Sequence, residues 1–177
     1  MAKQGWTLWF TGLHGSGKST IAEKLVNILK GKNIQVILLD GDEMRKTISA
    51  DLGYSKEERN EHMKRVANLC KEKSQEGAFT IASVASPTEQ SREYARKVLD
   101  KILIVYVKCP LEVCQKRDVK GHYKKAKENE KGFENFMKIS SNFEEPKNPD
   151  IVLETDKESV DESVDNLLSK LKEKGIV

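Results

Sequence analysis

The feature that most constrains this chain is the stretch at residues 12–20, Gly-Leu-His-Gly-Ser-Gly-Lys-Ser-Thr. It matches the phosphate-binding loop pattern (P-loop, or Walker A) of Gly, four residues, Gly-Lys and then Ser or Thr. Glycines let the backbone curl closely around a phosphate group, so that backbone N–H groups can face it. We expect Lys18 to reach the outer phosphates of a nucleotide and the Ser19 hydroxyl to bind Mg²⁺. An apolar run at 6–11 and an amphipathic run at 21–29 supply the strand and helix that the motif requires.

The chain has 177 residues, the length of one domain with a full hydrophobic core, so we expect a single domain over 1–177. Its net charge is only +3 and its acidic and basic residues are interleaved, which argues against nucleic acid as a partner. The N-terminus shows no signal-peptide pattern, and no apolar run approaches the roughly 20 residues that cross a bilayer, so no membrane partner is expected.

Three cysteines, Cys70, Cys109 and Cys114, are odd in number and form no metal-ligand pattern. We expect all three to pack as small apolar residues, in the reducing environment of the cytoplasm.

Apolar runs of strand length alternate with helical patterns along the chain. We expect strands at 6–11, 34–39, 79–84, 102–107 and 151–155, and helices at 21–29, 43–50, 56–75, 87–100, from 111 onward and at 159–174. The helix at 56–75 begins with a capping box, Ser55-Lys-Glu-Glu58. Apolar strands without alternation are typical of a sheet covered on both faces. The sequence therefore predicts an α/β fold with a doubly wound, mainly parallel five-stranded sheet and helices on both faces.

Two carboxylates, Asp40 and Asp42, follow the second expected strand. Ligands of open α/β sheets bind beyond the carboxyl ends of the strands, so these side chains should lie near the phosphate loop. A structural interpretation is also available, because Asp-Gly is a common turn pair and aspartate a good helix N-cap. We favour the functional interpretation, since Mg²⁺ is commonly held by one or two carboxylates together with substrate phosphates.

Residues 127–147 form a long charged stretch with few sheet-forming residues. Together with the residues before it, this stretch predicts a mobile lid over about 117–147. An enzyme that transfers a phosphoryl group needs such a cover, because water would otherwise compete as the acceptor.

A phosphate loop alone does not separate a small-molecule kinase from a GTPase or a motor ATPase. The chain is too short for the regulatory parts of a motor, and it contains no Asn-Lys-x-Asp sequence that would read guanine. A carboxylate pair, isolated arginines and a basic lid surround the place where a second substrate would lie. These observations favour a single-domain P-loop kinase that acts on a small molecule.

Further stretches resemble the adenylylsulfate kinase family, whose members phosphorylate the 3′-hydroxyl of adenosine 5′-phosphosulfate with ATP. The shared stretches follow the family's order over nearly the whole chain. They are residues 12–20, Leu39-Asp-Gly-Asp42 with Arg45, Asp51-Leu-Gly-Tyr-Ser55 with Arg59, Ser86-Pro87, residues 109–126, Lys131-Gly-Phe133 and Pro149-Asp-Ile-Val-Leu-Glu-Thr155. The block Arg-Asp-Val-Lys-Gly-His-Tyr-Lys-Lys-Ala at 117–126 is the most specific, because no general fold requires it.

The resemblance implies sulfate activation, with Mg²⁺-ATP as co-substrate and 3′-phosphoadenosine 5′-phosphosulfate and ADP as products. The implied ATP-binding residues are Gly12, Leu13, His14, Gly15, Ser16, Gly17, Lys18, Ser19, Thr20 and Arg117. The implied acceptor-binding residues are Asp42, Arg45, Tyr54, Arg59, His62, Ala85, Ser86, Lys120 and Phe133. Within this set, the two arginines would bind the phosphosulfate, and Tyr54 and Phe133 would stack on its adenine.

We assign the catalytic roles to Lys18, Asp40 and Asp42. Lys18 would neutralise charge on the moving phosphoryl group, and Asp42 would accept or orient the proton of the 3′-hydroxyl. Asp40 would hold the metal through water, beside Ser19. The resemblance also implies a homodimer and makes a functional link to ATP sulfurylase possible.

The chain differs from the family's usual pattern on the acceptor side and in the lid. His62 stands where asparagine is usual, Val84-Ala85 replaces Phe-Ile, Thr88-Glu89 replaces Tyr and often Arg, and the lid sequence at 133–139 is altered and longer. We expect smaller side chains and a new negative charge to change one wall of the acceptor pocket.

These differences leave two alternatives open. One is a related kinase that acts on another nucleotide-linked acceptor, such as a cytidine diphosphate derivative. The other is a non-catalytic nucleotide-binding module, although such a module would be expected to have lost at least one of Lys18, Ser19, Asp40 and Asp42, which are all present.

Overall fold

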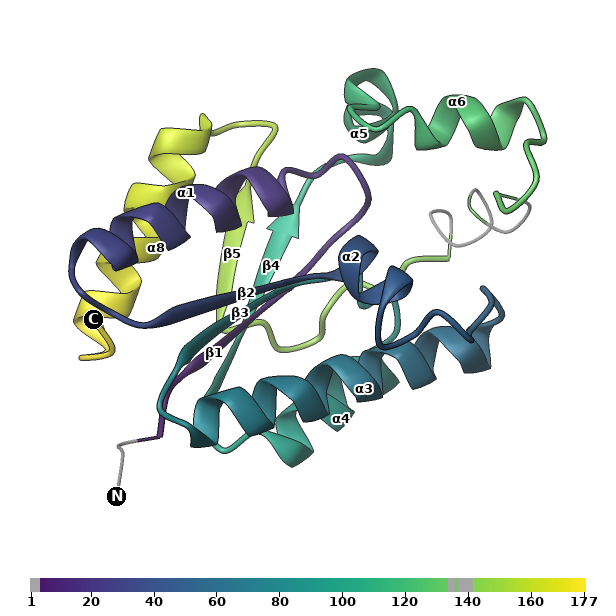
Figure 1. Cartoon of the computed structure of the whole chain (residues 1–177). Coiled ribbons are helices and arrows are strands. Elements are labelled where there is room, and N and C mark those ends of the chain that lie inside the picture. The colour runs from purple at the N-terminus through teal and green to yellow at the C-terminus, as the bar shows by residue number, and fades with distance from the viewer. Residues whose placement is uncertain (1–3, 134–135, 137–141) are drawn as a thin grey trace.

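The computed structural model describes residues 4–133, 136 and 142–177. Its centre is a five-stranded parallel sheet with the strand order β2-β3-β1-β4-β5 (Figure 1). The strands are β1 (Thr7–Thr11), β2 (Val36–Asp40), β3 (Phe79–Ser83), β4 (Ile102–Lys108) and β5 (Ile151–Glu154). The predicted doubly wound parallel sheet is therefore confirmed, and all five strands lie where the apolar runs placed them.

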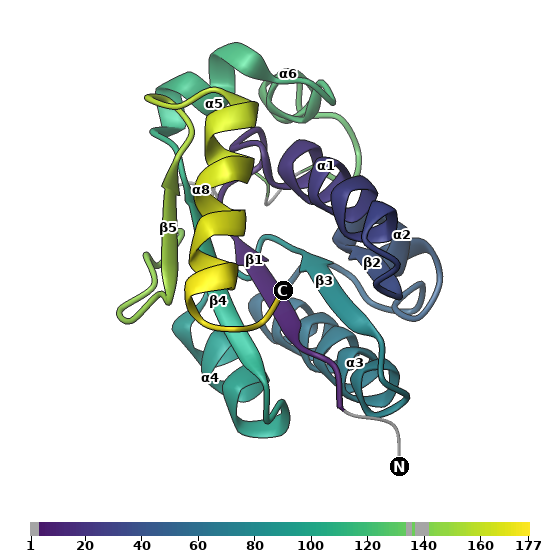
Figure 2. The same cartoon turned by 90° about the vertical axis from the view of Figure 1, so that its left-hand side faces the viewer.

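Helices cover both faces of the sheet, as Figure 2 shows. One face carries α1 (Lys18–Gly31) and α8 (Val160–Glu173), and the other carries α3 (Lys56–Gln75) and α4 (Glu89–Val98). Successive side chains of a strand point to opposite faces. Leu8 and Phe10 therefore join the core under α1 and α8, whereas Trp9 joins the core under α3 and α4, and all three are fully buried.

The order of the strands determines where a ligand can bind. After β1 the chain crosses to β2 at one edge, returns to β3 beside β1, and then continues to β4 on the other side of β1. The topology thus reverses between β1 and β3, and the carboxyl ends of strands at such a point diverge to form a crevice. The segments that follow these two strands, residues 12–17 and 84–88, lie at this crevice.

Three short helices lie at the carboxyl end of the sheet: α2 (Gly41–Lys46), α5 (Leu111–Arg117) and α6 (His122–Lys127). The helix α6 was not predicted, because residues 119–126 were taken as the approach to the lid. Its N-terminus is held by Asp118, whose carboxylate accepts hydrogen bonds from the backbone N–H groups of Tyr123 and Lys124, both at 3.0 Å. Residues 134–135 and 137–141 of the expected lid lie outside the described residues.

Most predicted boundaries lie within two residues of those observed, and the capping box of α3 forms in full. The largest differences are the start of α1, at Lys18 rather than residue 21, and the end of α2, at Lys46 rather than residue 50. Two other helix starts differ by two residues because a side chain caps the helix. Pro87 does not open α4; instead the Thr88 hydroxyl accepts from Ser91 N–H, so Thr88 is the N-cap and the helix begins at Glu89. The helix α2 begins at Gly41 rather than at residue 43, since Asp40 caps it.

None of the helices in the described part of the chain combines the length and the apolar character that crossing a bilayer would require. Cys70, Cys109 and Cys114 are buried free thiols, as expected. Burial raises the pKa of Cys70 to about 12, which keeps this thiol protonated and chemically quiet.

Candidate active site

A cavity of about 1130 Å³ opens at the carboxyl end of the sheet. It is lined by the phosphate loop on one side, by α2 and the start of α3 on the other, and by residues 117–120, 122–123, 131–133 and 136. A site for one small ligand typically measures about 300–1,000 Å³. This cavity is therefore slightly larger than the usual range for one small ligand.

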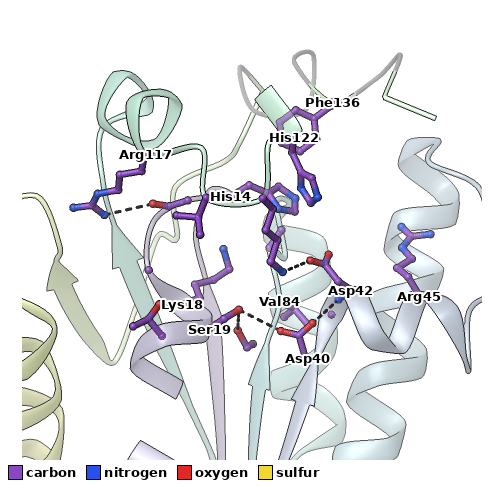
Figure 3. Close-up of a pocket in the computed structure, with 18 of the residues that line it drawn as sticks. His14, Lys18, Ser19, Asp40, Asp42, Arg45, Val84, Arg117, His122 and Phe136 are labelled. Atoms are coloured by element: carbon purple, nitrogen blue, oxygen red, sulfur yellow. Dashed lines mark hydrogen bonds and ion pairs between the residues drawn. The ribbon is translucent and has the colours of Figure 1, made fainter. Parts of the chain in front are cut away.

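The phosphate loop connects β1 to α1, as its sequence predicted. Lys18, the first residue of α1, is only 8% exposed, and its Nζ donates to the carbonyl oxygens of Gly12 (2.8 Å) and Leu13 (2.7 Å). Burial lowers the pKa of Lys18 to about 8. The ammonium group thus lies at the floor of the cavity (Figure 3), where bound phosphates would stabilise its charged form.

Ser19 and Asp40 lie together beside Lys18 (Figure 3). The Ser19 hydroxyl donates to Asp40 Oδ2 at 3.2 Å and lies 3.4 Å from the Ser83 hydroxyl. The other carboxylate oxygen, Oδ1, accepts from the N–H groups of Asp42 and Glu43 and caps α2. The structural interpretation of Asp40 is therefore confirmed, since one oxygen caps α2, while the other oxygen faces the Ser19 hydroxyl and leaves the functional interpretation a prediction.

Asp42 lies between Lys18 and Arg45 in Figure 3 and contacts Lys120 Nζ from the segment between α5 and α6. Burial alone would raise the pKa of Asp42, but the hydrogen bond from Lys120 and the neighbouring positive charges outweigh it and lower the pKa. Asp42 is therefore an ionised carboxylate at neutral pH, available to accept a proton or a hydroxyl hydrogen bond. Lys120 would have to move for Asp42 to take a substrate hydroxyl as its partner.

Two arginines flank Tyr54 at the far end of the cavity. The guanidinium carbon of Arg45 lies 4.7 Å from the Tyr54 ring centre and that of Arg59 lies 5.7 Å from it. Arg45 also donates to the Gly53 carbonyl (2.7 Å), and Arg59 to the Tyr54 carbonyl (2.7 Å). Burial, and then the charge of Arg45, lower the pKa of Arg59 to about 10. Two like charges held close together in a cavity favour a bound anion, which would relieve their repulsion.

Aromatic rings join the phosphate loop to the lid segment. His14 of the loop lies 4.9 Å from Phe136 and 5.5 Å from His122, measured between ring centres. Phe133 lies 5.4 Å from His122 and lines the same cavity. Burial, and then the charge of Lys18, lower the pKa of His14 to about 3, so this ring is neutral at pH 7.

The remaining predicted site residues divide into two groups: those that line the cavity, Gly15, Gly17, Thr20, His62, Ala85 and Arg117, and those that are not among its lining residues, Gly12, Leu13, Ser16 and Ser86. Arg117 and Ala85 line the cavity, and Arg117 donates to the Thr155 carbonyl at 2.6 Å. His62 also lines it but is 3% exposed, with its Nδ1 2.8 Å from the Ser49 hydroxyl. Ser86 is fully buried behind the wall, and its hydroxyl pairs with that of Ser91 at 2.8 Å. The Ser86 side chain is thus turned away from the cavity.

One expectation about the acceptor wall was wrong. Thr88 and Glu89 are not among the described residues that line the cavity. The Thr88 hydroxyl donates to Asn60 Oδ1 at 2.8 Å, and the Glu89 carboxylate forms an ion pair with buried Arg92 at 2.7 Å. The negative charge of Glu89 is therefore neutralised behind the wall and does not change the pocket.

The sequence reasoning missed three residues around the phosphate loop: Asp118, Tyr123 and Thr155. The Tyr123 hydroxyl donates to the His14 carbonyl at 2.8 Å, and the Thr155 hydroxyl donates to the Ser16 carbonyl at 2.6 Å. A signal was present for the first two, since both belong to the specific block at 117–126. Thr155 gave no signal beyond its place at the end of an expected strand.

Comparison with known proteins agrees with this geometry. The family model described as adenylylsulphate kinase matches residues 4–154. The chain belongs to the adenylylsulphate kinase family. It is 43% identical over 175 residues to the adenylyl-sulfate kinase of Halothermothrix orenii, covering 99% of this chain and 94% of that protein. It is also 43% identical over 178 residues to the adenylyl-sulfate kinase of Clostridium acetobutylicum, covering 100% of this chain and 88% of that one.

Among solved structures, the Mycobacterium tuberculosis APS kinase CysC in complex with AMPPNP and APS superimposes with a TM-score of 0.88 at 36% identity. The match covers 96% of this chain and 98% of that chain. The similarity therefore includes the segments at both ends of the cavity, those of the phosphate loop and those around Arg45, Tyr54 and Arg59.

Proposed function

We propose that this protein transfers the γ-phosphoryl group of ATP to the 3′-hydroxyl of adenosine 5′-phosphosulfate, giving 3′-phosphoadenosine 5′-phosphosulfate and ADP. One observation carries the proposal within the matched family. A single cavity has the phosphate loop with Lys18, Ser19 and Asp40 at one end and the Arg45–Tyr54–Arg59 group at the other, with Asp42 between them. This arrangement suits a nucleotide tail on one side and an anionic acceptor on the other.

Each part of the site then has a separate role in binding or catalysis. The phosphate loop and Lys18 bind the phosphates of ATP and stabilise charge on the group in transfer. The arginines hold the anionic end of the acceptor, and Tyr54, which is 49% exposed and lines the cavity, offers a ring face for its adenine. Asp42 accepts or orients the proton of the 3′-hydroxyl once Lys120 has released it. Catalysis would then rest mainly on positioning and electrostatics.

Magnesium fits the oxygen ligands that this site offers. Within the described residues no group of three or more His, Cys, Asp or Glu side chains is arranged to hold a metal by itself. A serine hydroxyl beside one carboxylate is the donor set expected for a Mg²⁺ ion whose other ligands are water and substrate phosphates. We assign Ser19 as a direct ligand and Asp40 as a ligand through water; the ion would supply charge neutralisation at the phosphates.

The test measures ADP release from ATP and Mg²⁺ with two acceptors in parallel, adenosine 5′-phosphosulfate and a cytidine diphosphate derivative. We expect turnover with the first only, and turnover with the second only would establish the alternative acceptor. Absence of phosphoryl transfer to either acceptor, with ADP still binding, would establish the non-catalytic alternative. Lys18→Ala is the matched inactive control, since it removes the loop's cation from the surface of the cavity.

Three further assignments rest on the family expectation. We propose a homodimer, which light scattering on the purified chain would test. We propose a functional link to ATP sulfurylase, the enzyme class that would supply the acceptor, to be tested by a coupled assay from sulfate. We also propose a cytoplasmic location, and the three free buried thiols are compatible with a reducing compartment.

A further inference from the structure

The carbonyl groups of the phosphate loop accept hydrogen bonds from one side chain of the loop itself, Lys18, and from three side chains outside it. Lys18 accounts for the first two carbonyls of the loop, as described above. The next three accept from the Tyr123 hydroxyl on His14 (2.8 Å), from Arg117 on Gly15 (3.4 Å) and from the Thr155 hydroxyl on Ser16 (2.6 Å). These donors come from α6, the end of α5 and the residue after β5, so three separate segments meet on one loop.

The backbone N–H groups of the same loop differ from its carbonyl groups in their hydrogen bonding. Among the described residues, the backbone N–H groups of Gly15 and Gly17 have no hydrogen-bond acceptor. In a trans peptide the C=O of one residue and the N–H of the next point in opposite directions. A donor that holds the His14 carbonyl therefore also fixes the direction of Gly15 N–H, and a donor on the Ser16 carbonyl fixes Gly17 N–H.

Both hydroxyl groups are supported rigidly. Tyr123 is 2% exposed, its N–H donates to Asp118, and its ring packs edge-on against Phe136 at 4.9 Å between ring centres. Thr155 is 9% exposed, and its N–H donates to the Lys108 carbonyl at 3.0 Å, continuing the ladder between β4 and β5. A hydroxyl fixed in this way can hold a peptide unit in one orientation before any ligand arrives.

We propose that Tyr123 and Thr155 are positioning residues for the donor nucleotide: their hydroxyls keep the N–H groups of Gly15 and Gly17 turned toward the phosphates. The inference rests on the proposed function, because it assigns the phosphate loop to the donor. Glycine is needed here for the backbone conformation as well, since both residues have positive φ values, 80° and 102°. Glycine allows the conformation, and the two hydroxyls select the orientation of the peptide units.

The test removes each hydroxyl without removing the side chain. Tyr123→Phe keeps the ring, and Thr155→Val keeps the shape while Thr155→Ser keeps the hydroxyl. We expect Tyr123→Phe and Thr155→Val each to weaken ADP binding by about three- to tenfold, because each removes one preorganising hydrogen bond. Thr155→Ser should bind ADP nearly as wild type does.

Matched controls separate this role from a general loss of stability. Tyr94→Phe removes a tyrosine hydroxyl that lies 3.4 Å from Asn68 on the far face of the sheet, and Thr7→Val removes a buried threonine hydroxyl that pairs with Thr80. Neither control should change ADP affinity. In steady-state assays KM for ATP should rise in Tyr123→Phe and Thr155→Val, while KM for the acceptor stays constant.

The proposed function and the positioning role can be refuted separately. ADP affinity, measured by titration calorimetry with Mg²⁺, needs no acceptor, so wild type that binds ADP without phosphorylating adenosine phosphosulfate would refute the proposed function alone. Unchanged ADP affinity in both Tyr123→Phe and Thr155→Val would overturn the positioning role. An equal loss of affinity in Thr155→Ser and Thr155→Val would also overturn it, because the hydroxyl would then have no part in the effect.

Discussion

Arg92 is a buried cation whose removal should destabilise the protein strongly. It is 2% exposed and lies on α4, where it contacts residues 143 and 144. It forms an ion pair with Glu89 (2.7 Å) and donates to the carbonyls of Ser86 and Glu144, both at 2.6 Å. The arginine therefore connects three segments: the start of α4, the loop after β3, where Ser86 has a positive φ of 41°, and Glu144.

The expected magnitude follows from what Arg92→Met would leave behind. The substitution keeps an unbranched side chain. It leaves the Glu89 carboxylate, which is only 20% exposed, and the carbonyl groups of Ser86 and Glu144 without the arginine as a hydrogen-bond donor. Removing one partner of a buried ion pair costs about 3–5 kcal/mol of unfolding free energy. In a domain of this size each kcal/mol corresponds to about 2–4 °C, so Tm should fall by about 6–20 °C.

A control on the same helix tests the assignment. Arg96 is 37% exposed and also forms an ion pair, with Asp150 at 2.8 Å. Arg96→Met should cost about 1 kcal/mol or less, as exposed pairs do. Adding Glu89→Gln to Arg92→Met should recover part of the loss, because it removes the stranded charge. Thermal and urea unfolding of wild type and these three variants measure this, and equal losses for Arg92→Met and Arg96→Met would refute the reasoning.

Three further predictions concern pH and catalysis. Bound phosphates should raise the pKa of Lys18 above about 8, so ADP binding takes up a proton. Calorimetry should therefore show the affinity for ADP falling above pH 8 in wild type but not in Lys18→Arg, because arginine stays charged. Burial lowers the pKa of His62 from 6.5 to about 4, so the unfolded chain binds a proton at a higher pH than the folded protein does. Urea unfolding should therefore show wild type losing up to about 1.4 kcal/mol of stability per pH unit relative to His62→Asn as the pH falls from 6.5 to 4, and a constant difference would contradict this. Asp42→Asn should lower kcat by about a hundredfold or more with ADP affinity retained, and a wild-type kcat would exclude Asp42 as the base.

The fold could be predicted from the sequence because local signals and burial agree. The five apolar runs became the five strands, and the capping box at Ser55 fixed the start of α3. Such features depend on residues close together in the chain, or on a face that must be covered. The starts of α2 and α4 were misplaced by two residues for one reason: the Asp40 or Thr88 side chain caps the helix and determines its first residue.

The candidate site was predictable only in part. The sequence identified Lys18, Ser19 and Asp40 through a motif and a strand end, and the structure places them together, although their roles stay predictions. It could not show that Glu89 faces Arg92 rather than the acceptor pocket. The sequence does not determine how α4 is rotated about its axis, and this rotation decides where the Glu89 side chain points. Nor could it show Thr155 on the phosphate loop, since this contact joins residues 139 positions apart.

The contacts of residues 117–126 give a structural reason for the specific sequence of this block. Arg117 donates to the phosphate loop, Asp118 accepts from two backbone N–H groups in the first turn of α6, Lys120 contacts Asp42, and Tyr123 donates to the His14 carbonyl. A short segment therefore contacts both the donor loop and the carboxylate that would serve the acceptor. Because its two helices are only seven and six residues long, they derive little stability from their own hydrogen bonds. The position of this segment must depend on these contacts, so a ligand that displaces Lys120 from Asp42 would also act on the turn that carries Tyr123 to the phosphate loop.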